Sequence, residues 1–379
     1  MRFLLLILFS SAVLAAPDEE LLGKAEGYPA CRGSDQKCLV GRYSRMDELF
    51  PSRKVAKGQA VRPLKVAPEP FDVDAFLAAN RNTGLMLVQG DTVLAERYQY
   101  DRKPEQRFGS ASMAKTVLGM LVGIALSEQK IRSIDQKAEE FVAELRGHPY
   151  GGTSLRHLLT MSSGVRFDDK DTPRLLRLSV QQQSEGGAAT VLPFDKRERQ
   201  AGKQFHYSNA DSQVLGLVLR AAVGKPLAEY LSEKIWQPMG AEADASWLVD
   251  KGGYEVAYCC LNATLRDYAR LGMLLATYGS YDGKEIIPRY WVRAATRPEA
   301  RHLRVGQATR FNGYGYQTWL IHEREPRFAA FGAYGQAVFV APNEKIVLVH
   351  TAIHESVRDT RARGAQFKLW DNVLAKLSP

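Results

Sequence analysis

The sequence predicts an α/β (α+β) fold in which helices flank an antiparallel sheet built from both chain ends, with a helical domain inserted between its two parts. Two patterns predict this fold. Segments with the apolar alternation of strands occur near both ends, whereas the stretch between them has mostly helical periodicity. With 379 residues, of which 45% are hydrophobic, the chain can bury a sizeable core.

The first segment, 1–15, has the pattern of a secretory signal peptide. Arg2 precedes an apolar run at 3–9, and small residues follow up to Ala15. The apolar run is too short to span a bilayer. We therefore expect cleavage after Ala15, a periplasmic or secreted mature protein, and no stable membrane span.

The next segment, 16–70, is rich in Pro, Gly and charged residues and has no clear periodicity. It predicts an extended N-terminal arm that lies on the body of the protein. The sheet domain is expected to consist of 71–111 and 296–379, and the mostly helical domain of 112–295.

Local patterns predict the elements of the sheet domain. An acidic start and apolar spacing predict a helix over 72–80. Gly90-Asp91 lies between two alternating segments and predicts the tight turn of a β-hairpin. The C-terminal part predicts three strand regions and a closing helix, at 313–320, 328–340, 345–351 and 361–377.

The inserted domain begins with a helix that runs to Leu126. Further periodic segments predict helices at 155–161, 210–223, 227–235 and 266–278. Between them, 168–204 is a long, loop-rich excursion of the kind usually found near a functional site.

Charge and ligand patterns exclude several function classes. The net charge is +9, but lysines and arginines are scattered without a basic block, so we expect no nucleic-acid partner. The sequence has no Cys-x-x-Cys pair and no His-Glu-x-x-His motif. His350 and His354 follow a strand-like segment, where their spacing does not pair them. We expect no metal and no cofactor.

The four cysteines are expected to form disulfides in an oxidising compartment. Three connectivities are possible. Pairing of Cys31 with Cys38 closes a short loop and is the simplest. A bond between the neighbours Cys259 and Cys260 would be strained, so cross-pairing with the N-terminal segment stays open.

The stretch FGSASMAK places Ser112 and Lys115 one helical turn apart, on the same face of the predicted helix. At the first turn, Ser112 has a free backbone N–H. A lysine buried among apolar residues would be driven towards its neutral form or would stabilise a phenolate. An acylatable serine needs such a base and such a donor. By itself the pattern is weak, because Ser-x-x-Lys also occurs at 34–37 and 127–130. An N-cap serine beside a solvated lysine would look the same.

A second pair of residues strengthens this interpretation. Tyr207 and Asn209 lie on a loop that enters an amphipathic helix. A phenol near an ammonium can serve as general base and acid, and an amide can hold the lysine without neutralising it. The two pairs together, in this order, are much rarer than either pair alone.

With these motifs the chain resembles the serine hydrolases of the class C β-lactamase and DD-peptidase superfamily, including its esterase and 6-aminohexanoate-oligomer hydrolase branches. The resemblance covers about 72–377 and rests on the stretches FGSASMAK, LRHLLTMSSGV, AGKQFHYSNADSQVLGLVL, VGKPLAEYLSEKIWQPMGA, LNATLRDYARLGMLLATYG, GYGYQTWL and GAYGQAVFVAPNEKIVLV. It implies the β-lactamase/transpeptidase-like fold. It also implies that Ser112 is the nucleophile and Lys115 its partner. Tyr207 would be general base and later acid, and Asn209 a positioning group for Lys115 or the substrate.

The third motif of the superfamily is often Lys-Thr-Gly or His-Thr-Gly, whose cation meets a substrate carboxylate. The matching stretch here, 330–332, is Ala-Phe-Gly and has no cation. The resemblance implies that Gly332, Ala333 and Tyr334 line the site. The backbone N–H groups of Ala333 and Ser112 would then hold the oxyanion.

The missing cation favours an esterase or amide-oligomer hydrolase over a β-lactamase or D-Ala-D-Ala carboxypeptidase, because the latter two recognise a free carboxylate. Arg327 or His354 could supply a cation from elsewhere. The segment 167–171 lacks the tyrosine that amide-oligomer hydrolases tend to carry after the Ser-Gly-Val turn, which weighs against that branch. Four aromatic residues are either pocket wall or core: Tyr314, Tyr316, Trp319 and Tyr334.

The sequence thus predicts an exported serine hydrolase that cleaves an ester or amide bond through an acyl-enzyme on Ser112. A small-molecule or peptide-like substrate is expected. The alternatives are DD-peptidase or β-lactamase activity, or a penicillin-binding module with slow turnover. The acyl group, the leaving group and the oligomeric state stay open.

Overall fold

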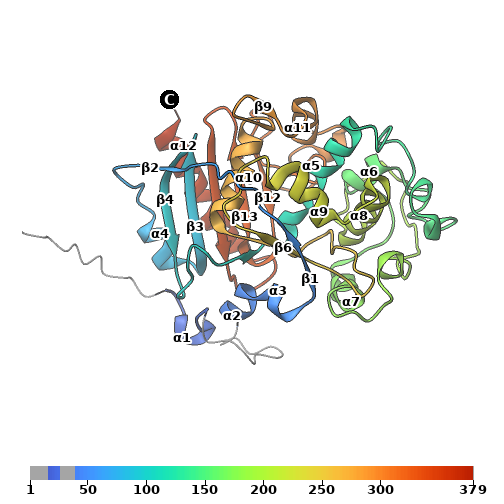
Figure 1. The fold of residues 1–379 in the computed structure, drawn as a ribbon, viewed down its shortest axis with the longest axis horizontal. Coiled ribbons are helices and arrows are strands. Elements are labelled where there is room, and N and C mark those ends of the chain that lie inside the picture. The colour runs from blue at the N-terminus through green and yellow to red at the C-terminus, as the bar shows by residue number, and fades with distance from the viewer. Residues whose placement is uncertain (1–15, 26–38, 379) are drawn as a thin grey trace, which may run out of the picture.

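The computed structural model describes residues 16–25 and 39–378, and its largest element is an eight-stranded sheet (Figure 1). The strand order is β10-β11-β12-β13-β14-β3-β4-β2, and β2 and β4 form its parallel pair. The strands are β2 (Lys65–Val66), β3 (Asn82–Gln89), β4 (Thr92–Tyr98), β10 (Gly313–Tyr314), β11 (Trp319–Leu320), β12 (Phe328–Phe331), β13 (Ala337–Ala341) and β14 (Ile346–Ala352). Strand β14 pairs antiparallel with β3. The two chain ends therefore share one sheet, which confirms the predicted fold class.

Both faces of this sheet are covered, which explains the nearly continuous apolar run in β3. Met86 and Val88 belong to the core under α10 (Leu265–Ala276), whereas Leu85 and Leu87 belong to the core on the other face. That second core is closed by α4 (Asp74–Ala79) and α12 (Thr360–Leu377), the two helices predicted at 72–80 and 361–377. Helix α10 covers the sheet although it lies within 112–295 (Figure 1).

A second sheet joins the predicted N-terminal arm to the inserted segment. Its order is β1 (Ser52–Val55), β6 (Ala245–Leu248), β7 (Leu261–Ala263) and β5 (Phe108–Gly109). The arm is therefore built into the protein through β1 and β2 and also forms the short helices α1 (Glu19–Leu22), α2 (Leu39–Ser44) and α3 (Met46–Leu49). The sequence analysis found none of these short arm elements, nor β6 and β7.

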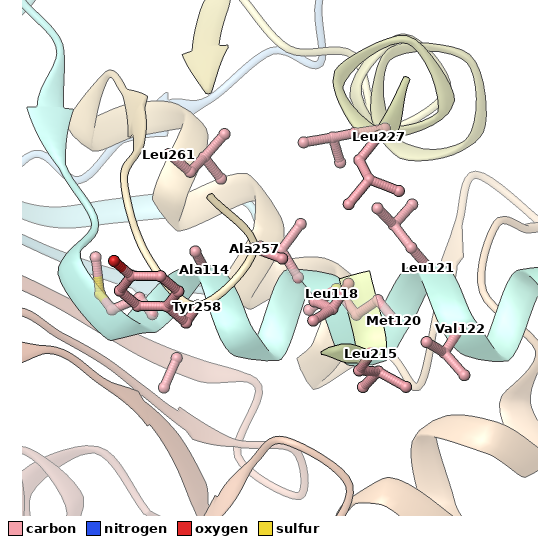
Figure 2. Close-up of a cluster of buried hydrophobic side chains, with 14 of the residues drawn as sticks. Ala114, Leu118, Met120, Leu121, Val122, Leu215, Leu227, Ala257, Tyr258 and Leu261 are labelled. Carbon is pink, nitrogen blue, oxygen red and sulfur yellow. The ribbon is translucent and has the colours of Figure 1, made fainter. Parts of the chain in front are cut away.

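The remaining helices pack around α5 (Ala114–Ser127), which is buried from Ala114 to Ala125. They are α6 (Leu155–Leu159), α7 (Thr172–Leu178), α8 (Asn209–Val223), α9 (Leu227–Leu231), continued by a π-helical turn at Ser232–Trp236, and α11 (Arg289–Ala295). A small hairpin, β8 (Ser280–Tyr281) and β9 (Lys284–Glu285), follows α10. Figure 2 shows side chains of α5 packed against Leu215 of α8 and Leu227 of α9. The start of α5 is thereby fixed in the core. Among residues 16–25 and 39–378, no helix is long and apolar enough to cross a bilayer.

Alanine substitutions at two helical glycines are expected to change the free energy of unfolding in opposite directions. A Cβ built on Gly272 of α10 would lie 2.4 Å from Val347 Cγ1, whereas one on Gly364 of α12 meets nothing within 4 Å. We expect Gly272→Ala to lower the free energy of unfolding by about 1–3 kcal/mol through overpacking. The matched control Gly364→Ala should raise it by about 0.5–1 kcal/mol through helix propensity. Urea denaturation measures both changes, and equal effects would contradict this view of the α10–sheet contact.

Candidate active site

Ser112 lies in a short 3-10 turn, Ala111–Met113, that leads into α5. The turn is anchored on β7, because Ser110 N donates to Leu261 O at 2.7 Å and Leu261 N donates to Ser110 Oγ at 3.1 Å. Ala111 has a φ of 44°, a conformation that costs energy for a non-glycine residue. The backbone is thus held under strain at the residue before Ser112, a feature typical of functional sites.

Lys115 is buried one turn later and makes three short contacts. Its Nζ lies 2.9 Å from Ser112 Oγ, 2.7 Å from Asn209 Oδ1 and 2.7 Å from the backbone oxygen of Tyr258. None of these partners carries a charge. Burial lowers the pKa of Lys115 well below its usual value.

The three contacts of Lys115 indicate where the two N–H groups and the lone pair of a neutral amine would point. Asn209 presents its amide oxygen Oδ1 to Lys115, and its Nδ2 donates to Thr172 Oγ1 at 3.1 Å. Oδ1 and the Tyr258 backbone oxygen are carbonyl oxygens, which can only accept. A neutral amine has two N–H groups, which these two oxygens use, so its lone pair faces Ser112 Oγ. The arrangement suits an amine that accepts the serine proton.

Tyr207 lies beside this pair at the entry to α8. Burial raises its pKa to about 12, although a hydrogen bond with Ser112 and the positive charge of Arg358 oppose the rise. Its ring stacks on Trp319 at a centroid distance of 5.3 Å, and Lys115 Nζ lies 5.0 Å from the ring centre. At neutral pH this residue is a protonated phenol that can donate to an oxygen or nitrogen near Ser112.

The end of β12 meets the nucleophile segment. A Cβ on Gly332 would lie 2.6 Å from the backbone oxygen of Ser110, so this close approach requires glycine. Ala333 begins a 3-10 turn after it, and first-turn N–H groups have no intrahelical acceptor. The structure thus brings the predicted third-motif residues next to the 110–112 segment. Tyr334 packs edge-on against Tyr43 of the N-terminal arm, with ring centroids 5.7 Å apart.

Arg327 and His354, the two residues that could replace the missing cation of the third motif, do not supply one. Arg327 pairs with Glu325 at 2.6 Å and with Glu344 at 3.1 Å. Burial lowers the pKa of His354 to about 4, so this residue is neutral at physiological pH. The guanidinium beside the motif is that of Arg363, which lies over the ring of Phe331 at 4.5 Å and donates to the backbone oxygen of Gly332 at 3.1 Å.

The predicted aromatic residues divide between the site and the core. Trp319 stacks on Tyr207 and is partly buried, and Tyr314 packs edge-on against both. Tyr316 instead packs on Trp291 and donates to Glu299 Oε2 at 2.9 Å, away from this cluster. In the described part of the chain, no group of His, Cys, Asp and Glu side chains could hold a metal ion.

The sequence analysis missed two contributors to the site. The Tyr258 contact uses a backbone oxygen, which no residue pattern encodes. Arg358 lies close enough to affect the pKa of Tyr207 and pairs with Asp169 at 2.6 Å. This ion pair joins the loop after β14 to the 168–204 excursion, which contains helical turns at Asp169–Asp171 and Gly187–Thr190 as well as α7.

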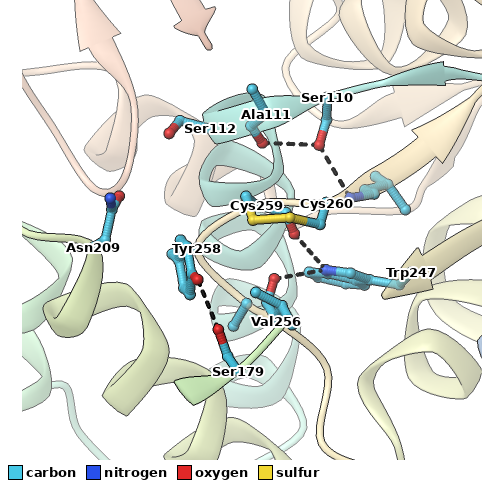
Figure 3. The surroundings of a disulfide bond; sticks show 12 residues. Ser110, Ala111, Ser112, Ser179, Asn209, Trp247, Val256, Tyr258, Cys259 and Cys260 are labelled. Atoms are coloured by element: carbon cyan, nitrogen blue, oxygen red, sulfur yellow. Dashed lines mark hydrogen bonds between the residues drawn. A yellow bond between two sulfur atoms is a disulfide. The ribbon is translucent and has the colours of Figure 1, made fainter. Parts of the chain in front are cut away.

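Cys259 and Cys260 are joined in a disulfide beside the Ser110–Ser112 segment (Figure 3). The sequence left the pairing open; the structure contains the bond between neighbours, so these two cysteines do not cross-pair with the N-terminal segment. The backbone is left-handed at the second cysteine, since Cys260 has a φ of 74°. Cys31 and Cys38 lie outside the described residues.

Asp211 supports the loop that carries Tyr207 and Asn209. Its backbone N–H donates to the N-cap Ser208 Oγ at 3.1 Å, and its Oδ1 accepts from Ser163 Oγ at 2.8 Å. Its Oδ2 is buried without a partner. Burial raises the pKa of Asp211 to about 7, against 3.8 in the unfolded chain.

A folded-state pKa above the unfolded value means that the native protein binds more protons between the two values. Stability therefore falls as pH rises from about 4 to about 7. Between pH 5 and 8, we expect the wild type to lose up to about 3 kcal/mol relative to Asp211→Asn. Chemical denaturation of both proteins at the two pH values measures this difference. Parallel pH dependence would show that Asp211 is ionised in the native state throughout.

A 6-aminohexanoate-dimer hydrolase of Paenarthrobacter ureafaciens is 24% identical over 327 residues, covering 81% of this chain and 83% of that protein. A Bacillus anthracis structure provisionally assigned as a 6-aminohexanoate-dimer hydrolase superposes with a TM-score of 0.81 at 25% identity, covering 91% of this chain and 96% of that one.

A penicillin-binding protein structure from Bacillus halodurans shares the fold, with a TM-score of 0.61 at 16% identity and coverage of 77% of this chain and 97% of that one. The Beta-lactamase family model matches residues 73–365. This match spans the sheet that unites the two chain ends, the Ser112–Lys115 turn and the Tyr207 loop. The chain therefore belongs to the Beta-lactamase family.

Proposed function

We propose that this protein is a serine hydrolase that cleaves an ester or amide bond through an acyl-enzyme on Ser112. The observation that carries the proposal is the contact set of Lys115. Two obligate acceptors occupy two of its N–H groups, and the third contact, at 2.9 Å, is Ser112 Oγ. The membership in a family of hydrolases supports the same reaction class.

The reaction follows from the positions of these groups. Neutral Lys115 takes the Ser112 proton as Oγ attacks the substrate carbonyl, and the N–H groups of Ser112 and Ala333 hold the developing oxyanion. The phenol of Tyr207 protonates the leaving oxygen or nitrogen as the bond to it breaks. Water then attacks the acyl-enzyme as the Tyr207 phenolate takes a proton from it, and the Lys115 ammonium returns a proton to Ser112 Oγ as the acid leaves. In this assignment Lys115 is the general base of acylation and Tyr207 is the acid, whereas the family resemblance by itself implies that Tyr207 is the base and later the acid.

The residues at the third motif support an uncharged acyl or leaving group. Ala330 is buried, and Phe331 packs against Trp319, Phe339 and Arg363. These two side chains offer a free carboxylate no cation, and the neighbouring guanidinium of Arg363 is engaged with the ring of Phe331 and the backbone oxygen of Gly332. The relative from Paenarthrobacter ureafaciens is named as a hydrolase of an amide dimer, so we include amide oligomers with simple esters as candidate substrates.

The nucleophile is tested by labelling with a fluorophosphonate and by hydrolysis of a panel of short-chain esters, a 6-aminohexanoate dimer, a cephalosporin and a D-Ala-D-Ala peptide. We expect Ser112→Ala to abolish the label and to lower hydrolysis by at least about a thousandfold. Ser127→Ala is the matched control, because Ser127 lies at the other end of the same helix in the same Ser-x-x-Lys spacing.

Equal labelling of wild type and Ser112→Ala would refute the proposal. A stable β-lactam adduct on Ser112 with negligible turnover of every substrate would instead identify a penicillin-binding module. Rapid cephalosporin or D-Ala-D-Ala hydrolysis would move the activity to the β-lactamase or peptidase branch.

The pH profile of acylation tests the roles of Lys115 and Tyr207. Because the amine must be neutral, the fluorophosphonate rate should rise with pH through the lowered pKa of Lys115, well below 10.5. It should stay high until Tyr207 ionises at about 12. Lys115→Arg should remove the rising limb with most of the rate. A rate that already falls with pH in the neutral range would show that a protonated Lys115 is required.

We also propose that the protein is exported through the segment 1–15, which lies outside the described residues. The pattern of Arg2, the apolar run and Ala15 supports this proposal, as does a disulfide in the folded protein. Intact mass of the protein recovered from the periplasm or medium would locate the cleavage site.

A further inference from the structure

The Cys259–Cys260 disulfide lies between two contacts that hold the site together (Figure 3). The residue before it, Tyr258, presents the backbone oxygen that accepts from Lys115 Nζ at 2.7 Å. The residue after it, Leu261, exchanges hydrogen bonds with Ser110, two positions before the nucleophile. A change in the backbone at 259–260 is therefore transmitted to both Lys115 and the Ser112 turn.

The backbone at this point has a conformation that favours glycine. Cys260 has a φ of 74°, which is unfavourable for a side chain with a Cβ. The outer side of the turn is fixed, because Trp247 Nε1 donates to Cys259 O at 2.9 Å and Leu248 N donates to Cys260 O at 3.1 Å. The covalent ring between the two neighbours restrains the turn from within. Without it, Cys260 can relax to negative φ. This change rotates the 259–260 peptide, which adjoins the 258–259 peptide that carries the Tyr258 oxygen.

We propose that the Cys259–Cys260 disulfide is a redox-sensitive positioning element for Lys115, an inference that rests on the proposed function. In the oxidised protein the ring holds the Tyr258 oxygen against Nζ, so that the lone pair of the neutral amine faces Ser112. A dithiol transfers two electrons and two protons to the bond, which becomes two thiols while the dithiol becomes a disulfide. The Tyr258 oxygen then loses its fixed position, and acylation of Ser112 slows.

The positions of the cysteines suit such a response. Both are nearly buried, with 8% of Cys259 and 7% of Cys260 exposed. A small dithiol such as dithiothreitol is the matching reductant. Cys259 directly follows Tyr258, whose backbone oxygen accepts from Lys115. Reduction can therefore alter the site while leaving the sheets and α5 in place.

The test compares acylation rates of Ser112 by a fluorophosphonate, followed by intact mass, with and without dithiothreitol. Alkylation and peptide mapping of each sample show whether Cys259 and Cys260 are reduced. We expect reduction to slow labelling about ten- to a hundredfold. This is the effect of losing one hydrogen bond, that from Lys115 to the Tyr258 oxygen, when Lys115 gains charge by taking the Ser112 proton. Reoxidation should restore the rate. A Cys31→Ser/Cys38→Ser protein should keep this sensitivity.

Two double variants separate positioning from general stability. Cys259→Ser/Cys260→Ser should be slow and insensitive to dithiothreitol. Cys259→Ser/Cys260→Gly should recover most of the oxidised rate, because glycine adopts the φ of position 260 without a Cβ penalty. A role of the bond in stability alone predicts that both variants behave alike at temperatures below their melting transitions.

Full labelling speed in protein whose Cys259 and Cys260 are both alkylated would overturn the proposal. Labelling of the Cys259→Ser/Cys260→Ser protein at the wild-type rate would also overturn the proposal. This variant gives the decisive comparison if dithiothreitol does not reduce the bond. If Cys259→Ser/Cys260→Ser does not fold, the Cys259→Ser/Cys260→Gly protein is compared with the reduced wild type. If the oxidised wild type is itself not labelled, the proposed function fails, and this result is distinct from each of the others.

Discussion

The whole site depends on a lysine buried without a counter-charge. Lys115 is surrounded by a serine hydroxyl, an amide oxygen and a backbone oxygen, and a bound proton there is not compensated by any carboxylate among its contacts. Placing a charge in such surroundings costs free energy, which lowers the pKa of the lysine well below its usual value. The two oxygens that can only accept then direct its lone pair to Ser112. Burial and hydrogen-bond direction together make a weak base out of a residue that is normally an acid.

The fold supplies these contacts from segments far apart in the chain. Ser112 and Lys115 come from the first turns of α5, which is buried along almost its whole length and cannot shift. Asn209 comes from the start of α8, where the hydroxyl of Ser208 caps the helix by accepting from the backbone N–H of Asp211. The Tyr258 oxygen comes from the turn that enters β7. The large sheet adds β12 and Ala333, so the closure of both chain ends in one sheet completes the proposed oxyanion side.

Much of this arrangement follows from the sequence, because it is encoded in periodicity and spacing. The hairpin around Gly90, the apolar helix after Ser112 and the amphipathic helix after Asn209 all have clear periods, and the structure contains each of them. A serine and a lysine three positions apart on a helix must share a face. What the sequence does not encode are contacts made by the backbone or by short elements. The Tyr258 oxygen would be the same for any residue at 258, and β1, β6 and β7 are too short for a period to be recognised.

The sequence left the disulfide pairing open, because four cysteines allow three connectivities and their spacing does not choose among them. The central claim, a neutral Lys115, is tested most directly by NMR of protein labelled with ¹³Cε and ¹⁵Nζ lysine. The resonance absent from Lys115→Arg assigns the residue, and a pH titration gives its pKa. The account predicts a titration well below 10.5. A Lys115 resonance that stays in its ammonium form up to 10.5 or beyond would contradict it.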